Sequence, residues 1–146
     1  MDAVTIFLLA MTPVGELRVS IPFGIGLHRM HWLIVFVLSL LGNMIPPLII
    51  LYGFDRLPFL RKWKLFTSKP MQKASWISRF GYMGLLLLVA IPLPGTGAWT
   101  GSLLAWILRL SKGTALLMIL LGVCLAGIIV TLASLGFLHL IGLPEQ

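Results

Sequence analysis

Two long stretches of the sequence contain no Asp, Glu, Lys or Arg, and they limit the possible folds more than any other feature. They are residues 30–54 and 113–144. A helix crosses the hydrocarbon core of a bilayer, about 30 Å thick, with about 20 apolar residues, because each residue rises about 1.5 Å. Both stretches are long enough, so we expect each to form a transmembrane helix. The first should be kinked near Pro46 and Pro47.

The composition excludes most other classes of protein. Hydrophobic residues make up 59% of the chain and charged residues 10%, whereas an ordinary soluble domain carries about 25% charged residues. So few charges could not cover the surface of a soluble enzyme, and the single cysteine rules out a disulfide scaffold. We therefore expect an all-α integral membrane protein. Met1-Asp2-Ala3 is not followed by a basic segment, so we expect no signal peptide.

Two further apolar regions, residues 3–27 and 80–109, are each interrupted by turn-forming residues. The first is broken at residues 12–18 and the second at residues 92–97. The resulting arms of about ten to fifteen residues are too short to cross a membrane. We expect each region to form a re-entrant helical hairpin that enters and leaves on the same side, with its turn buried in protein or facing a water-filled cavity.

The order of these segments predicts an inverted repeat within one membrane domain, residues 1–146. Each half contains a hairpin, a short polar loop and a spanning helix. Because each half makes one net crossing, the second half is inverted relative to the first, as in many secondary transporters. We place repeat 1 at residues 3–54, a linker at 55–79 and repeat 2 at 80–142. A shift of 80 residues pairs Gly15 with Gly95, Arg29 with Arg109, and Gly42 with Gly122.

The basic residues orient this topology. Of the 11 Lys and Arg residues, nine lie in the linker or at Arg109 and Lys112, on the same side of the predicted membrane protein. Basic loops face the cytoplasm, so both termini are expected outside. Within the linker, Phe59, Leu60, Trp63 and Phe66 recur at helical spacing among Arg61, Lys62 and Lys64, which indicates an amphipathic segment against membrane lipids.

Glu16 and Arg18 lie at the break of the first hairpin, at intramembrane depth in this topology. A charge there costs at least about 2.5–3.5 kcal/mol, so such residues pair with each other or line a pathway. One interpretation is a structural ion pair that pins the hairpin. The other gives Arg18 a bound anion and gives Glu16 a proton or a coupling cation such as sodium.

The second break is uncharged, and its glycines allow a ligand to approach the backbone closely. The N-terminus of the following half-helix favours an anion such as phosphate, although a tight helix crossing explains glycines equally well. Asn43 either lines the cavity or hydrogen-bonds a neighbouring helix. The candidate substrate-binding residues are thus Arg18, Glu16, Asn43, Gly95, Thr96, Gly97, Trp99 and Thr100.

The sequence contains no metal-ligand spacing, no nucleophile paired with a base and no phosphate-binding loop of the nucleotidase type. We therefore expect no enzyme activity, no cofactor and no nucleic-acid partner. With only two spanning helices to shield both hairpin turns, we expect a homodimer or larger assembly. The face of Gly122 and Gly127 is the candidate contact.

Glu16-Leu17-Arg18 followed by Ile21-Pro22, then Gly42-Asn43 and the run from Ile91 to Gly101, resemble the small multi-drug export protein family of prokaryotes. The resemblance covers nearly the whole chain. That family is similar to the DedA/VTT superfamily, whose members share paired re-entrant hairpins and are implicated in moving polyprenyl-phosphate carriers or phospholipids between leaflets. The resemblance implies that fold, a location in the prokaryotic cell membrane and a transport role.

Three functions remain open at this point. The first is a transporter or flippase for an amphipathic substrate such as a lipid-linked phosphate or a phospholipid, coupled to protons or sodium. The second is a small exporter of hydrophobic or cationic drugs, with Glu16 as the counter-ion of the substrate. The third is a membrane scaffold that transports nothing.

Overall fold

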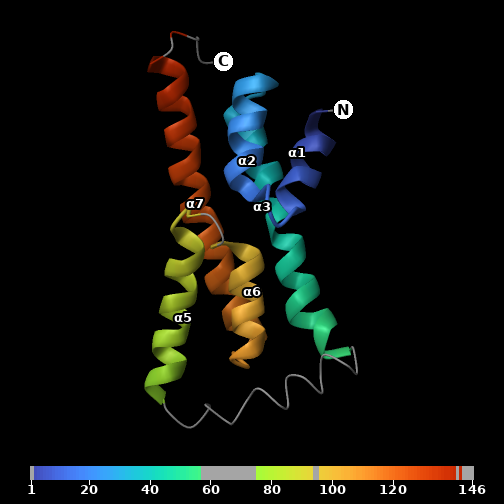
Figure 1. The fold of residues 1–146 in the computed structure, drawn as a ribbon, viewed down its shortest axis with the longest axis vertical. Coiled ribbons are helices and arrows are strands. Elements are labelled where there is room, and N and C mark those ends of the chain that lie inside the picture. Colours follow the sequence, from blue (N-terminus) through green and yellow to red (C-terminus); the bar gives the residue numbers. More distant parts are fainter. Residues whose placement is uncertain (1, 57–74, 94–95, 141, 143–146) are drawn as a thin grey trace. The chain divides into compact units, whose positions relative to one another are not determined.

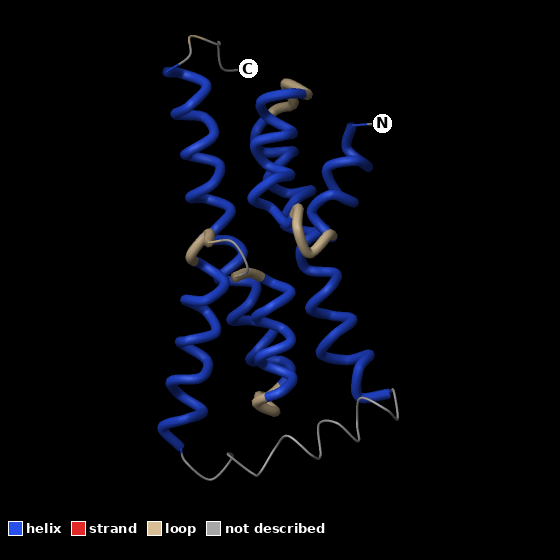
Figure 2. Tube along the Cα trace, in the orientation of Figure 1, coloured by secondary structure: helices blue, strands red, loops and turns tan. Residues whose placement is uncertain are grey.

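The computed structural model describes residues 2–56, 75–93, 96–140 and 142, and these residues form helices and no strand (Figures 1 and 2). The all-α prediction is confirmed for this part of the chain. The amphipathic pattern from Phe59 to Phe66 and the candidate Gly95 lie outside the described residues. The helices are α1 (Asp2–Met11), α2 (Glu16–Pro22), the π-helix η1 (Phe23–Leu27), α3 (Trp32–Leu48), the π-helix η2 (Ile49–Gly53), the 3₁₀ turn η3 (Phe54–Arg56), α5 (Ser75–Ala90), α6 (Ala98–Ile107) and α7 (Lys112–Leu140).

Two continuous helical segments are long and apolar enough to cross a membrane. They span Trp32–Arg56 and Lys112–Leu140, with mean hydropathies of 2.3 and 2.8. Both coincide with the uncharged stretches, so the length argument is confirmed. The arms around the two breaks are shorter, as their sequences predict, and α5 begins at Ser75, inside the segment expected to be linker.

The element boundaries repeat along the chain. Helix η1 ends at Leu27 and α6 at Ile107, while α3 begins at Trp32 and α7 at Lys112. Each pair is separated by the shift of 80 residues read from the sequence. The turn in between repeats as well, because Arg29 and Arg109 have φ angles of 47° and 54°, a left-handed conformation that few residues other than glycine adopt. The two halves therefore share their local folding.

The helices group into two compact units. Unit 1 comprises Met1–Ile45 with Val123–Gln146, and unit 2 comprises Pro46–Gly122. Each unit contains one hairpin together with parts of α3 and α7. In unit 1, α1 packs against α2, and in unit 2, α5 packs against α6 (Figure 1).

Glycines allow each long helix to approach the first arm of a hairpin. A Cβ on Gly42 would lie 2.4 Å from the Phe7 carbonyl oxygen, and one on Gly122 would lie 2.7 Å from Val89 Cβ. A Cβ on Gly127 would lie 2.8 Å from the Phe36 ring. The assignment of Gly122 and Gly127 to a dimer interface is therefore wrong, because residues of the same chain already cover both glycines.

Proline marks the points where α-helix changes to π-helix. Pro46 and Pro47 lie inside α3 and η2 begins two residues later, while Pro22 ends α2 directly before η1. Proline has no N–H to donate, so the carbonyl four residues earlier loses its usual helical partner. Changing to π-helical hydrogen bonding keeps the segment helical beyond the proline, and such π segments often occur near functional sites.

Candidate functional site

Four polar residues in unit 1 are almost completely buried among apolar side chains. Glu16 is 6% exposed, Asn43 is 1% exposed, and Ser20 and Ser39 are fully buried. Glu16 and Ser20 are one helical turn apart on α2, and Ser39 and Asn43 are one turn apart on α3. Residues four apart share a helix face, so each helix presents two polar residues in a row. We call these four residues the polar seam.

The two rows face each other. Ser20 Oγ donates a hydrogen bond to Ser39 Oγ at 2.7 Å, and a Cβ on Gly24 would lie 2.6 Å from Val35 Cγ1. Residue numbers fall on the first segment as they rise on α3, which is an antiparallel register. One turn beyond the serine pair, the same register brings Glu16 and Asn43 to the same level.

Asn43 supplies a polar atom without a partner in this interior. Its Oδ1 is buried and accepts no hydrogen bond from the residues that the structure describes. Leaving such an atom unpaired costs about 1–3 kcal/mol, and buried polar groups in native proteins are nearly always satisfied. A ligand that donates a hydrogen bond, or a bound cation, would satisfy this oxygen.

The hairpin turn that carries Glu16 and Arg18 has a defined geometry. Thr12 Oγ1 donates to the Leu9 carbonyl oxygen at 2.8 Å and accepts from Gly15 N–H at 2.9 Å. Glu16 follows with a φ of 40°, in the left-handed region. A non-glycine residue rarely adopts this conformation, and residues held in it cluster at functional sites.

Arg18 lies beside this carboxylate and is less buried. The Arg18 Nη2 to Glu16 Oε2 distance is 4.0 Å, and the exposed fractions of the two side chains are 18% and 8%. At that separation the two groups form a long ion pair. Each charge lowers the cost of burying the other, while the guanidinium retains a route to the surface. Both interpretations of this pair, pinning and binding, are compatible with this geometry.

The candidate residues of the second hairpin lie in unit 2. Thr96 Oγ1 lies 2.8 Å from the Ile91 carbonyl oxygen and 2.9 Å from that of Leu93, so this hydroxyl closes the turn. Gly97 then adopts a φ of 146°, which side chains disfavour, and precedes α6. Trp99 is half-buried and Thr100 is exposed on the first turn of α6.

Sequence analysis missed Ser20 and Ser39. Their signal is visible in hindsight as polar residues spaced by four in apolar segments, Glu16 with Ser20 and Ser39 with Asn43. A spacing of four shows that two residues share a face but not which face is buried or what it meets. The pairing of the serines therefore required the tertiary structure.

A second polar cluster, in unit 2, was also missed. Asp55 Oδ2 lies 2.6 Å from Lys112 Nζ, and Trp106 Nε1 donates to Asp55 Oδ1 at 2.9 Å. Lys112 Nζ also lies 5.3 Å from the centre of the Tyr52 ring. The carboxylate thus joins η3 to α6 and to the start of α7. In sequence analysis Asp55 and Lys112 served only as charges for orienting the topology.

Comparison with known proteins identifies the family. The model of the small multi-drug export protein family matches residues 16–129, from the first hairpin turn well into α7. The chain belongs to this family. No curated protein and no solved structure matches it significantly.

Family membership together with the two apolar spans makes this small multi-drug export family member a membrane protein of a transport class. The match begins at Glu16, so it includes the whole polar seam and Arg18. It also includes the second hairpin turn. The wider similarity to the DedA/VTT superfamily stays a prediction.

Proposed function

We propose that this protein is a membrane transporter or flippase for an amphipathic molecule with an anionic head group, such as a polyprenyl phosphate or a phospholipid. The supporting observation is the polar seam of the first hairpin, with Arg18 beside it. Ionisable residues inside a membrane protein are costly and usually mark a substrate or ion pathway. An ion pair that served only to pin a turn would not require the adjoining unpaired oxygen of Asn43.

The roles follow from burial and chemistry. Arg18 is the more exposed partner, and its planar guanidinium suits two oxygens of a phosphate at once. Glu16 is the more buried partner, so we assign it the proton or sodium ion that couples transport. Asn43 Oδ1, at the level of Glu16 in the helix register, would contribute a neutral oxygen to the same ion or to the head group.

In the second hairpin, we assign substrate contact to the first turn of α6. Backbone N–H groups at a helix N-terminus attract anions, and Gly97 leaves the approach to this turn free of a side chain. Trp99 adds an amphipathic ring and Thr100 an exposed hydroxyl. Thr96 supports this arrangement by closing the turn rather than by binding substrate through its hydroxyl.

The same proposal includes the membrane topology. Two re-entrant hairpins in inverted halves, with the basic linker in the cytoplasm and the termini outside, satisfy the lengths of the arms and the placement of the basic residues. A homodimer or larger assembly in the cell membrane would shield the hairpin turns from lipid. Its interface then uses a face other than that of Gly122 and Gly127.

The direct test is leaflet exchange of a fluorescent polyprenyl phosphate in vesicles that contain the purified protein. Arg18→Gln should slow the exchange at least about tenfold, since a charge-assisted hydrogen bond contributes about 1.5–3 kcal/mol. Arg29→Gln is the matched control, because Arg29 lies exposed in the loop of the same unit. Equal rates for the wild type and Arg18→Gln, with both proteins folded by size-exclusion chromatography, would refute the assigned site.

The burial of Glu16 favours one alternative, export of hydrophobic cations with this carboxylate as the counter-ion. In cells that express the protein, this alternative predicts drug resistance that Glu16→Gln abolishes and Arg18→Gln preserves. The lipid-phosphate proposal predicts that both substitutions abolish transport. A protein whose phenotype survives both substitutions together would instead be the scaffold.

A further inference from the structure

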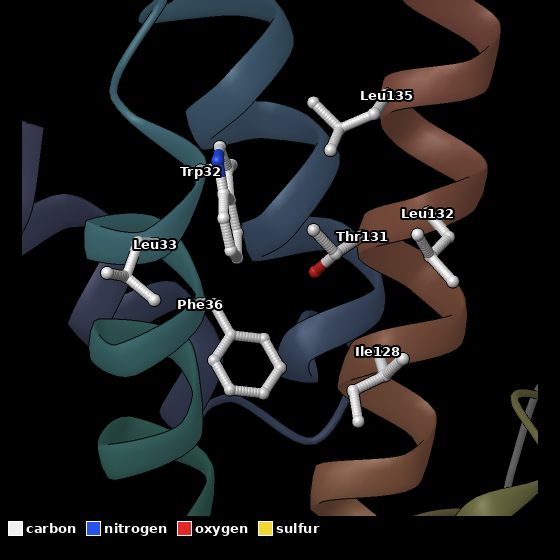
Figure 3. A pocket seen from close by; sticks show the side chains of 7 residues that line it. All are labelled: Trp32, Leu33, Phe36, Ile128, Thr131, Leu132 and Leu135. Carbon is white, nitrogen blue, oxygen red and sulfur yellow. The ribbon is translucent and has the colours of Figure 1, made fainter.

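Unit 1 contains an apolar pocket between the first half of α3 and the second half of α7 (Figure 3). Its volume is about 410 Å³. One wall comes from α3 and the other from α7, and the lining residues are Trp32, Leu33, Phe36, Ile128, Thr131, Leu132 and Leu135. All but Thr131 are apolar, so the pocket offers an apolar ligand van der Waals contact on two sides.

Thr131 is the one hydroxyl-bearing residue of the lining. Its side chain is 5% exposed, and its Oγ1 has no hydrogen-bond partner among the residues that the structure describes. A threonine in a helix can satisfy its hydroxyl by donating to the carbonyl one turn earlier, but Thr131 does not. Figure 3 shows the hydroxyl oxygen directed from α7 toward the space in front of Phe36. The wall of the pocket therefore holds one unsatisfied polar atom.

Size and chemistry define what would fit. Ligand pockets are typically about 300–1,000 Å³, mostly apolar, with a few polar groups that fix the orientation of the ligand. An apolar cavity of about 150 Å³ already holds benzene, so 410 Å³ accommodates a considerably longer alkyl chain or a fused ring system. A single hydroxyl in the wall selects a ligand with one hydrogen-bonding group, such as an alcohol or an ester carbonyl.

The pocket continues along α3 into the polar seam. Phe36, Ser39 and Asn43 are spaced by three and four residues and so share one face of this helix. From Phe36 to Asn43 the helix rises about 10 Å. An amphiphile could therefore place its polar head at the seam and its apolar chain in the pocket, within one unit.

We infer that this pocket binds the apolar chain of a membrane-dissolved amphiphile and that Thr131 hydrogen-bonds a polar group on that chain. The inference rests on the proposed function in that the ligand is the substrate of transport. It specifies the apolar moiety of the substrate, whereas Arg18 and Glu16 specify its head group.

Two glycines on α7 provide a matched pair of variants. A methyl group on Gly127 would lie 2.8 Å from Phe36 Cε2, so the ring that lines the pocket must move, whereas a methyl group on Gly136 meets nothing within 4 Å. Gly127→Ala and Gly136→Ala make the same chemical change in the same helix. Only the first is expected to reshape the pocket.

The experiment is photolabelling of the full-length protein in lipid vesicles with a dodecanol analogue that carries a diazirine, followed by peptide mapping. We expect the label on the peptides that contain Trp32–Phe36 and Ile128–Leu135, about fivefold weaker in Gly127→Ala and unchanged in Gly136→Ala. Thr131→Val should weaken labelling by the alcohol about fivefold, as expected for a hydrogen bond of about 1 kcal/mol. Labelling by the corresponding alkane probe should not change.

Three results would overturn the inference. Label spread evenly over the exposed leucines, with no effect of Gly127→Ala, would mean that the probe dissolves in bulk lipid. Pocket labelling that appears only after an oligomer is dissociated would mean that a second copy covers the site. An equal effect of Thr131→Val on both probes would remove the role of the hydroxyl. If the labelling holds but Arg18→Gln leaves leaflet exchange unchanged, the proposed function fails while the pocket stands.

Discussion

The two repeats of this protein share their element boundaries but differ in the polarity of their interiors. With the shift of 80 residues, Ser39 and Asn43 of the first repeat correspond to Ile119 and Val123 of the second. All four are buried, so the same positions carry a polar pair in one repeat and an apolar pair in the other. The comparison separates scaffold from chemistry, because the glycine crossings and the turns at Arg29 and Arg109 recur, while the polar seam occurs in the first repeat.

The largest expected effect tests the shared scaffold. Gly42→Ala and Gly122→Ala should each lower the free energy of unfolding by about 1–3 kcal/mol, since the added methyl group overpacks a close helix crossing. Gly42 should be the more sensitive, because its methyl group meets a backbone oxygen at 2.4 Å. Unfolding in detergent micelles measures both, with Gly113→Ala and Gly136→Ala as controls in open space. Unchanged stability in the first two variants would break the structural equivalence of the repeats.

The next effect concerns the cluster around Asp55. Asp55→Asn should destabilise unit 2 by about 1–2 kcal/mol, because it weakens the contact with Lys112 and the charge-assisted hydrogen bond from Trp106. A double-mutant cycle with Lys112→Met isolates the ion pair. Both side chains are about one third exposed, so a coupling of about 0.2–1 kcal/mol is expected. No coupling would show that the carboxylate acts through Trp106 alone.

A smaller effect of opposite sign tests the difference between the repeats directly. Asn43→Val gives the first repeat the residue found at the equivalent position of the second. Stability should rise by about 1 kcal/mol, since an unpaired buried oxygen is removed, while leaflet exchange falls. A gain in stability at the expense of activity is typical of functional residues. A loss of stability would instead give Asn43 a structural role, and the control Val123→Ala should destabilise without this trade-off.

The smallest effect concerns the serine pair. Ser20→Ala and Ser39→Ala should each destabilise the protein slightly, and the double variant should cost less than the sum of the two. Hydrogen bonds between transmembrane helices couple by about 0.6 kcal/mol on average, and the 2.7 Å bond predicts a value of that order. Strictly additive costs would mean that the bond does not hold α2 against α3.

The sequence predicted much of the secondary structure because the signals are local. Apolar runs longer than a bilayer gave the two spanning segments, and Pro and Gly gave the two breaks within the shorter regions. The shift of 80 residues anticipated the starts of α3 and α7. Glu16 and Arg18 stood out because a charge inside an apolar run is rare. Each of these inferences needs only a residue and its neighbours in the chain.

The candidate site was less predictable because it depends on which helix faces meet. Sequence spacing did not show that Ser20 meets Ser39, and the tertiary structure gave the Thr96 hydroxyl to the turn. The glycines that were assigned to a dimer face instead admit Val89 and Phe36 of the same chain. A glycine marks a close approach, but it does not identify the group that approaches.

The sequence by itself therefore determined the class of this protein, its helical segments and the two charges at the first hairpin turn. Tertiary packing alone decided that Asn43 is buried with an unpaired oxygen, and that Thr131 lines an apolar pocket one turn beyond the polar seam. Hydropathy and turn propensity act along the chain, so they can be read from it. Burial and hydrogen-bond satisfaction arise between segments far apart in sequence, and only the folded structure fixes which of them touch.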